Sequence, residues 1–415
     1  MKKIYDVIII GGGSAGLFCG AHLNTLETLV LEKMERVGKK LLISGGGQCN
    51  YTHTGDLKFF QEKYGNQGKF ISHVLKGFSN QELIEYFKVN GVESFVREDG
   101  KIFPKSLNSA TVVELLKRKN REIRCDEEVI KISHDGQFHI ETGSSRFECR
   151  HLVIATGGNS YPPLGSSGEG YKFAEMLGHT ITPISPALTP IWVKHSPFKS
   201  LMGIGLKSVE ISIYKNAKIL KRHVGDLGFT HFGLSGPAII DASRYMTSGE
   251  KIEVNFIYSH FKNSEVLENF FISEFEKNSK KQIHNFLKIL EIPERFLDVI
   301  LKISEVSSEK KLCEISKTER KKLIITLTQY EIEIEKLGEF SIAMATTGGV
   351  NCIEVSPKTL QSKIVENLYF IGEVLDVDGD TGGYNIQFAF SSGYKCAENI
   401  MKKERIQGEK NETER

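Results

Sequence analysis

The sequence of 415 residues lacks several features that would assign it to a class of protein at once. Its seven cysteines are dispersed and no two form a CxxC pair, which gives no support to a dithiol relay or a zinc knuckle. No uninterrupted apolar run is long enough to cross a bilayer. We therefore expect a cytoplasmic protein with reduced thiols, no membrane partner and no metal site.

An excess of charge of one sign is also missing. Lys and Arg together number 54 and Asp and Glu 52, which leaves a formal net charge of +2. Scattered and balanced charges do not create the field that attracts a polyanion. We therefore expect a small-molecule substrate and no nucleic-acid partner, while the composition does not indicate an oligomeric state.

The chain begins with the pattern of a nucleotide-binding βαβ unit. A β-branched run at residues 7–10 leads into a glycine-rich turn, residues 11–16, and a second apolar run ends at Leu31-Glu32. Gly11 permits a tight turn, Gly13 lets the backbone approach a pyrophosphate, and Gly16 lets the helix pack on the strand. The helix N-terminus would face the phosphates, and Glu32 would accept hydrogen bonds from ribose hydroxyls. The pattern predicts an ADP moiety but does not distinguish NAD from FAD.

Four further glycine-rich segments follow along the chain. They are residues 38–50 with three adjacent glycines, residues 155–158 after a buried strand, residues 165–171 opening a helix, and residues 371–387. So many glycines raise the conformational entropy that these segments lose on folding, and the usual reason for them is close approach of the backbone to a ligand. The last segment has a strand ending in Gly372-Glu373, a carboxylate suited to ribityl hydroxyls, and then a helix that begins near Tyr384 or Asn385. Together these segments favour a flavin, whose rings extend well beyond the ADP site.

The pattern of residues along the chain changes three times. Strand-and-glycine patterns fill the first part, alternating antiparallel-strand patterns run from about 190 to 259, and Lys, Glu, Leu and Ile at helical spacing run from about 263 to 335. Strand and glycine return at residue 345. This order predicts an α/β fold in which a Rossmann-like FAD-binding domain is interrupted by an inserted β-rich, barrel-like domain and a small helical domain. The predicted bounds are 1–189 and 341–405 for the first, 190–260 and 331–340 for the second, 261–330 for the third, and 406–415 for a charged tail.

Taken together, these segments resemble a bacterial family of flavoproteins, the BaiN-like or aminoacetone-oxidase-like NAD(P)/FAD-dependent oxidoreductases. The resemblance covers nearly the whole chain and is most specific at residues 40–50, 229–238 and 372–393. It implies three domains and non-covalent FAD. Carried over by position, it assigns the following residues to the cofactor: Gly11, Gly13, Ser14, Ala15, Gly16, Glu32, Lys33, Lys40, Ser44, Gly45, Gly47, Cys49, Asn50, Val129, Ala155, Thr156, Gly157, Gly158, Gly372, Glu373, Asp378, Gly383, Tyr384, Asn385 and Ile386.

The chain departs from the family pattern at two positions. The glycine loop usually continues with Arg where this sequence has Gln48, and the segment at 165–171 usually carries Asp where Glu169 stands. The loss of a fixed cation at position 48 leaves open which substrate anion, if any, this loop would hold.

Two side chains have alternative interpretations. Cys49 is either a redox or adduct-forming thiol or, the favoured alternative, a small residue packed against the cofactor. His231 is either a proton donor facing the flavin, which makes it the candidate catalytic residue, or a residue that caps or fills the turn before Gly233.

We predict an FAD-dependent oxidoreductase that transfers a hydride or an electron pair between a small organic substrate or NAD(P)H and the flavin. The reacting atoms are expected in a crevice between the FAD domain and the β-rich insert. No second dinucleotide fingerprint is present, so NAD(P)H would have to visit the flavin directly as a transient donor. The alternative is an FAD-binding module with a non-catalytic or RNA-modifying role, and a reductase and an amine oxidase both stay open.

Overall fold

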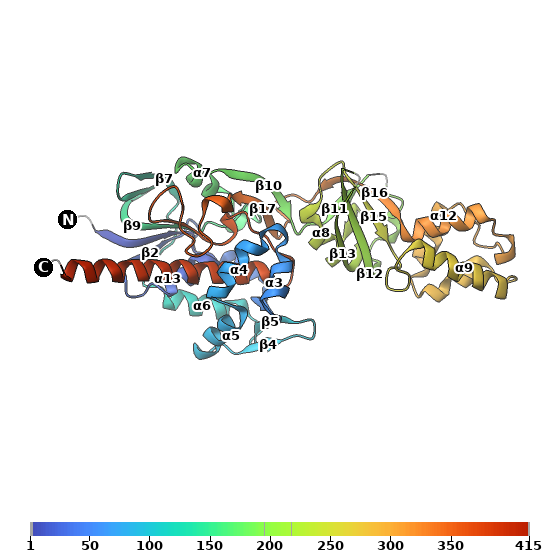
Figure 1. Cartoon of the computed structure of the whole chain (residues 1–415), viewed down its shortest axis with the longest axis horizontal. Coiled ribbons are helices and arrows are strands. Elements are labelled where there is room, and N and C mark those ends of the chain that lie inside the picture. The colour runs from blue at the N-terminus through green and yellow to red at the C-terminus, as the bar shows by residue number, and fades with distance from the viewer. Residues whose placement is uncertain (1–2, 195, 217, 414–415) are drawn as a thin grey trace. The chain divides into compact units, whose positions relative to one another are not determined.

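A computed structural model describes residues 3–194, 196–216 and 218–413 (Figure 1). Contacts divide the chain into two compact units. Unit 1 consists of Met1–Ser185 and Met344–Arg415, and unit 2 of Pro186–Ala343. Unit 1 is therefore assembled from the two ends of the chain, with unit 2 inserted between them.

The centre of unit 1 is a parallel sheet. Strands β6 (Glu122–Arg124), β2 (Thr28–Leu31), β1 (Ile4–Ile10), β9 (Arg146–Ile154) and β18 (Leu368–Phe370) lie side by side in that order. Residues 7–10 and 152–154 are almost completely buried, as expected for central strands covered on both faces. The predicted α/β fold with a Rossmann-like domain is confirmed.

Strand β9 also begins an antiparallel extension of this sheet. Its first half pairs with β8 (Phe138–Thr142), which pairs with β7 (Val129–His134). Two smaller sheets complete the strands of unit 1: β3 (Thr52–His53), β5 (Lys101–Pro104) and β4 (Ser94–Val96) form one, and β10 (Ile181–Ala187) with β17 (Ala345–Val350) forms the other.

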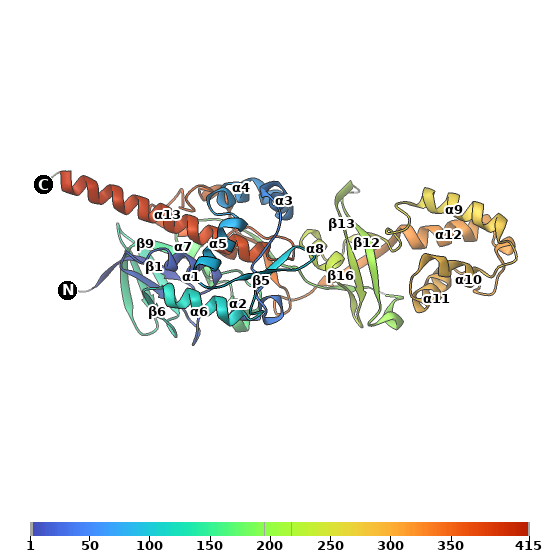
Figure 2. The same cartoon turned by 90° about the horizontal axis from the view of Figure 1, so that it is seen from below.

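Helix α1 (Ser14–Ala21) is sandwiched in the interior and packs against the long helix α13 (Tyr384–Thr413) (Figure 2). A Cβ on Gly393 would come within 2.6 Å of the Ala15 carbonyl oxygen, so the two helices approach at backbone distance. Helix α13 includes residues 406–413 of the predicted charged tail. The other helices of unit 1 are α2 (Lys39–Ile43), α3 (Leu57–Lys63), α4 (Gly68–Gly77), α5 (Asn80–Val89), α6 (Ser109–Lys119) and α7 (Glu169–Met176).

Unit 2 contains a closed barrel, as the alternating pattern predicts. Its strands, in order around the barrel, are β11 (Ile191–Val193), β14 (Gly233–Ser235), β13 (Lys218–Phe229), β12 (Gly205–Lys215), β15 (Lys251–Asn255) and β16 (Tyr330–Leu337). Helix α8 (Pro237–Ala242) starts with Pro in its first turn. Helices α9 (Ser264–Lys277), α10 (Ile283–Leu287), α11 (Glu294–Ile303) and α12 (Lys317–Thr328) lie between β15 and β16 in the sequence.

The helical spacing in the sequence runs to about residue 335, beyond the predicted end of the helical domain at 330. In the structure α12 ends at Thr328, and Tyr330–Leu337 is the barrel strand β16. In that strand Ile332 and Ile334 point into the core while their acidic neighbours face outward. A run of alternating Ile and Glu therefore satisfies the period of a strand, although its composition also suits a helix.

Across the described ranges, no helix is both long enough and apolar enough to cross a membrane.

Candidate functional site

The glycine turn after β1 has the geometry expected for a dinucleotide loop. Gly11 has φ +109°, and a Cβ there would come within 2.5 Å of the Ala155 carbonyl oxygen. A Cβ on Gly16 would overlap the Gly11 carbonyl oxygen, which explains the close packing of α1 on β1. Gly13 differs from both, because a Cβ there would meet nothing within 4 Å.

The N-terminus of α1 opens onto this free space. Gly13 is its N-cap and supplies no side-chain cap, so the first N–H groups of the helix keep their hydrogen-bonding capacity. Ser14 and Ala15 form the first turn of the helix. Open space at Gly13 and an uncapped helix start are the two features of this structure that fit a pyrophosphate.

Glu32 follows β2 and is held next to this turn. Its carboxylate accepts hydrogen bonds from the Gly12 N–H at 2.8 Å and the Met34 N–H at 2.9 Å. Burial raises the pKa of Glu32, although these backbone hydrogen bonds oppose the shift. Carboxylate oxygens carry further lone pairs, so the predicted contact with a ribose is compatible with both bonds.

Lys33 is paired within the protein. Its ammonium contacts the Glu169 carboxylate and the Ser167 hydroxyl. The next residue, Met34, also lies close to this segment, because a Cβ on Gly165 would be 3.0 Å from the Met34 side chain. Burial acts to raise the pKa of Glu169, but its bonds to Lys33 and Ser167 lower it below the usual value. The longer carboxylate at this departure from the family pattern thus has a cationic partner.

Val129 lies at the start of β7 and is buried. The chain just before it contacts the Glu32 loop, since the Glu127 N–H donates to the Glu32 carbonyl at 3.0 Å and the Asp126 N–H to the Met34 carbonyl at 3.1 Å. Val129 is therefore close in the fold to the residue predicted for the ribose, as its assignment to the adenine side requires.

A second group of predicted residues meets at Glu373. Lys40 Nζ donates to Glu373 Oε2 at 2.7 Å, and Ser160 Oγ and the Thr346 N–H donate to Oε1 at 3.2 and 2.9 Å. A Cβ on Gly158 would lie 3.1 Å from the Glu373 carboxyl carbon. The carboxylate predicted for the ribityl chain thus already has several partners from the protein, and a ribityl hydroxyl would have to share or replace them.

The other residues of the 155–158 turn and Gly372 lie against the same elements. Gly157 has φ +75°, and a Cβ on it would come within 2.7 Å of Ser166 Oγ. The Thr156 hydroxyl is buried with no hydrogen-bond partner in the described part of the chain. A Cβ on Gly372 would lie 2.9 Å from Ala15 Cβ, which connects the last glycine segment to the first.

The triple-glycine loop contacts the start of α13. The Asn50 amide oxygen accepts from the Gly383 N–H at 3.2 Å, and its nitrogen donates to the Thr52 and Ile102 carbonyls. A Cβ on Gly383, where φ is +96°, would lie 2.7 Å from the Thr52 carbonyl oxygen. Gly45 is similarly close to the Asn50 backbone nitrogen. The structure therefore brings residues 44–52 and 383–386 together.

The side chains at the start of α13 are held by the protein. Asn385 bonds the Gly379 N–H at 2.8 Å and the Gly379 carbonyl at 2.9 Å, so it fixes the preceding loop. The Tyr384 ring stacks on His53 with centroids 5.3 Å apart. Asp378 accepts a hydrogen bond from Thr347 Oγ1 at 2.8 Å. Ser44, Gly47 and Ile386 lie in the same two segments and are partly exposed.

Cys49 is fully buried in this loop, and burial raises the pKa of its thiol to about 12. The thiol therefore stays protonated at neutral pH, which favours packing over a redox role. We expect N-ethylmaleimide at about pH 8 to modify the exposed Cys313 in the native protein and to leave Cys49 unmodified until the chain is unfolded. Peptide mass mapping gives the measurement, with Cys313→Ser as the control. Rapid native labelling of Cys49 would show that the thiol is activated.

His231 belongs to unit 2, where it is exposed and its ring lies 4.7 Å from that of Phe232. The turn before Gly233 is closed by Thr230, whose backbone and hydroxyl bond Gly233 at 2.9 and 3.0 Å. Thr230 therefore supplies the hydrogen bonds that close this turn. Both interpretations of His231, as a residue that fills the turn and as a proton donor to the flavin, stay predictions.

Several polar residues near the predicted cofactor residues were not found from the sequence. Ser160 and Thr346 share Glu373 with Lys40, and His53 stacks on Tyr384. Thr346 lies in a strand-and-glycine run that the sequence did single out. Ser160 and His53 carry no local signal, since only the folded chain brings them to the site.

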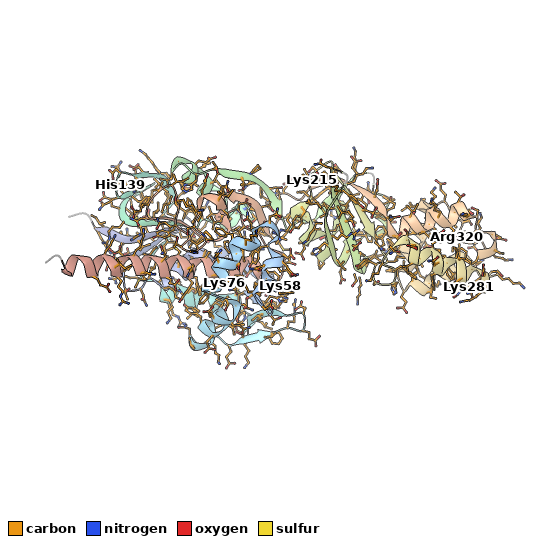
Figure 3. The ribbon with its side chains drawn as sticks, viewed as in Figure 1. Lys58, Lys76, His139, Lys215, Lys281 and Arg320 are labelled. Carbon is orange, nitrogen blue, oxygen red and sulfur yellow. The ribbon has the colours of Figure 1, made fainter. Side chains whose placement is uncertain are left out.

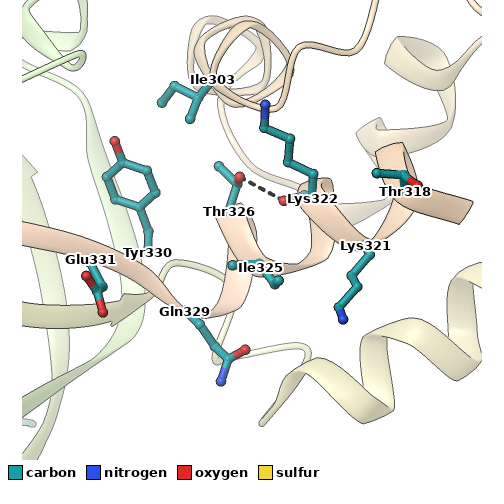
Figure 4. Close-up of a pocket in the computed structure, with 9 residues that line it drawn as sticks. All are labelled: Ile303, Thr318, Lys321, Lys322, Ile325, Thr326, Gln329, Tyr330 and Glu331. Atoms are coloured by element: carbon teal, nitrogen blue, oxygen red, sulfur yellow. Dashed lines mark hydrogen bonds between the residues drawn. The ribbon is translucent and has the colours of Figure 1, made fainter. Parts of the chain in front are cut away.

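A pocket of about 580 Å³ lies in unit 2 between α12 and the start of β16 (Figure 4). Its lining includes Lys321, Lys322, Gln329 and Tyr330, and Thr326 Oγ1 bonds the Lys322 carbonyl at 2.8 Å. None of its lining residues belongs to the predicted cofactor set.

Known proteins that resemble this chain agree with the flavoprotein prediction. The model of the HI0933-like protein Rossmann domain matches residues 5–399. A ribosomal RNA dihydrouridine synthase from Haemophilus influenzae is 32% identical, over 97% of this chain and 100% of the relative. A 3-dehydro-bile acid delta(4,6)-reductase from Clostridium scindens is 31% identical, over 93% and 96%.

Among solved structures, a 3-ketosteroid delta1-dehydrogenase from Sterolibacterium denitrificans shares the fold with a TM-score of 0.50 and 10% identity, over 96% of this chain and 99% of that one. The two curated relatives are aligned over almost their full lengths, so the likeness is not confined to the nucleotide-binding turn. The chain therefore belongs to the HI0933-like family and is an FAD-dependent oxidoreductase with a Rossmann-like domain.

Proposed function

We propose that this enzyme uses FAD to reduce a carbon–carbon double bond conjugated with a carbonyl group, and that its substrate is a uracil base in ribosomal RNA. The observation that carries the proposal is the full-length similarity to two relatives named for such reductions. Dihydrouridine is uridine with a saturated ring double bond next to a carbonyl. A delta(4,6)-unsaturated 3-ketone has the same conjugated arrangement. The greater coverage of the ribosomal RNA enzyme favours uracil.

The balance of the reaction follows from its chemistry. The uracil double bond gains a hydride and a proton, and NAD(P)H, which supplies the hydride, leaves as NAD(P)⁺. Bound FAD would pass this hydride from the donor to the base. A base in a folded RNA must be unpaired to reach such a site.

The chain's own residues would bind and orient the cofactor. Gly13 and the start of α1 would receive the pyrophosphate and Glu32 the ribose, with Lys40, Glu373 and the 44–50 loop along the flavin. His231, exposed on the turn between β13 and β14, is our candidate for the residue that supplies the proton.

The test begins with the FAD-loaded protein under anaerobic conditions. Addition of NADH or NADPH is expected to bleach the flavin band, and addition of ribosomal RNA is then expected to restore it while dihydrouridine forms, as measured by mass spectrometry of digested RNA. A 3-keto steroid with conjugated double bonds serves as the competing substrate. Restoration of the band by the steroid and not by RNA would overturn the uracil assignment. A flavin that no nicotinamide bleaches would overturn the proposed donor.

A further inference from the structure

A basic ribbon protrudes from the barrel of unit 2 at the hairpin between β12 and β13. Four of the eight residues 215–222 are Lys or Arg, and none of the residues 211–225 is acidic. Lys215 pairs with Lys218 at the end of the hairpin, so two like charges lie opposite each other. Lys215, Lys218 and Arg222 are exposed (Figure 3 labels Lys215).

This part of the hairpin extends beyond its neighbouring strands. Strand β15 pairs with β12 only from Glu210 to Ile213, and β14 pairs with β13 only at Gly228 and Phe229. The hairpin end thus has no third strand beside it within the described ranges. The end of a two-stranded ribbon that leaves its sheet offers both of its edges to a partner, while α8 packs against β13 nearer the barrel, where His223 lies 3.6 Å from Asp241.

The charges at the end of the ribbon are not neutralised by the protein. Within residues 3–194, 196–216 and 218–413, no carboxylate lies within ion-pair distance of Lys215 or Lys218. Further along, Lys221 lies over the Tyr245 ring at 5.7 Å. Ser212 of β12 pairs with Arg222 of β13 on one side and with Glu253 of β15 on the other, so one strand separates Arg222 from Glu253. The balanced composition of the whole chain therefore conceals a local excess of positive charge.

The ribbon also exposes apolar side chains between its lysines. Ile219 is 42% exposed, Leu220 50% and Val224 47%. Lysines spaced along an extended strand can contact successive phosphates, and adjacent apolar side chains can pack against sugars and bases. An acidic protein surface would offer charge but no such alternation of charge and apolar faces along an extended chain.

We propose that the ribbon formed by residues 214–216 and 218–224 binds the phosphate backbone of an RNA strand. This inference rests on the proposed function, because it identifies how a protein with little net charge would hold ribosomal RNA. The ribbon contributes affinity that does not depend on sequence, and the choice of the uracil is left to the active site.

The variant K215E/K218E tests the proposal, and K280E/K281E in the helical part of unit 2 is the matched control. Lys280 and Lys281 are exposed and produce the same change of net charge (Figure 3 labels Lys281). Glutamate keeps the hairpin edge charged, so any protection of that edge against aggregation is retained. Binding is measured by fluorescence anisotropy with a fluorescein-labelled oligouridylate at several salt concentrations, on the FAD-loaded protein.

K215E/K218E is expected to weaken binding about tenfold at 0.1 M salt and to lower the slope of log affinity against log salt by about 1.4, from two phosphate contacts. K280E/K281E should bind like the wild type. Equal weakening in both variants, or wild-type binding by K215E/K218E, would overturn the proposal. The proposal would also be overturned if K215E/K218E lost binding only to vesicles that contain phosphatidylserine and kept its binding to oligouridylate. That result would identify a lipid surface as the partner.

The readouts also separate this proposal from the proposed function. A wild-type protein that binds RNA through the ribbon but forms no dihydrouridine refutes the uracil reaction and leaves the ribbon intact as an RNA site. Dihydrouridine formation with equal efficiency in the wild type and K215E/K218E supports the reaction and refutes the ribbon. Bleaching by NAD(P)H should be equal in all variants, which shows that each one is folded and loaded.

Discussion

Substitution of Gly13 by Asp is expected to weaken FAD binding strongly and to leave the apoprotein folded. A side chain at Gly13 meets no atom within 4 Å, and its backbone, at φ −82° and ψ −169°, suits any residue. Asp is a good N-cap, so the stability of the apoprotein should stay within about 0.5 kcal/mol of the wild type. The carboxylate would nevertheless occupy the space predicted for the pyrophosphate. Two unit charges about 4 Å apart repel by about 4 kcal/mol at an effective dielectric constant of about 20.

We therefore expect the affinity for FAD to fall at least about a hundredfold, which corresponds to about 2.7 kcal/mol. Titration of apoprotein with FAD, followed by flavin fluorescence, measures the affinity, and thermal unfolding measures the stability. Gly143→Asp is the control, because Gly143 also faces open space and lacks a left-handed φ. A Gly13→Asp protein with wild-type affinity would mean that the pyrophosphate lies elsewhere.

Substitution of Gly16 by Ala is expected to destabilise unit 1 by about 3 kcal/mol, at the upper end of the cost of overpacking. The added Cβ would overlap the Gly11 carbonyl oxygen. This is a backbone atom of a residue whose N–H donates to the Leu31 carbonyl at 2.8 Å, so it cannot turn away as a side chain can. Relief of the overlap would require α1 to move off β1, and the open space at Gly13 would change with it. FAD affinity should therefore fall together with stability.

Gly20→Ala is the matched comparison on the same helix. Its Cβ would overlap Asn120 Oδ1, which belongs to a side chain that can rotate. The side chain would give up hydrogen bonds to the Leu17 and Leu116 carbonyls, at about 0.5–1 kcal/mol each, while Ala gains about 0.5–1 kcal/mol of helix propensity. Circular dichroism during unfolding should show a change within about 1 kcal/mol. Equal losses in both variants would show that the Gly16 overlap is relieved at little cost.

The sequence predicted the elements whose signal is local. The strand at residues 7–10, the glycine turn and the helix that begins at Tyr384 are all found, because hydrophobic period and glycine position decide them. The helical spacing overlaps strand β16 as far as residue 335, because Glu, Lys and Ile occur in both structures and only pairing with β11 and β15 makes this segment a strand. The net charge of the whole chain likewise gave no sign of residues 211–225, a segment without a single acidic residue.

The candidate site could be predicted as a set of segments and not as a set of bonds. Gly11, Gly16, Gly45, Gly157, Gly158 and Gly383 mark where other atoms leave no room for a side chain, and the structure gathers most of these glycines around α1 and the start of α13. The partners of Glu373 come from residues 40, 160 and 346, which are far apart in the sequence, and no local pattern specifies that they meet. Non-local pairing of this kind depends on the sheet order, which the sequence alone did not provide.

The position of β18 next to β9, and of α13 against α1, has a consequence during synthesis on the ribosome. The opening βαβ unit emerges first, but its last parallel strand and its covering helix are translated only after the whole barrel and the helices that follow it. Because residues 372–386, which we predict to contact the flavin, also follow the barrel in the chain, we expect cofactor loading to come late in the maturation of this enzyme.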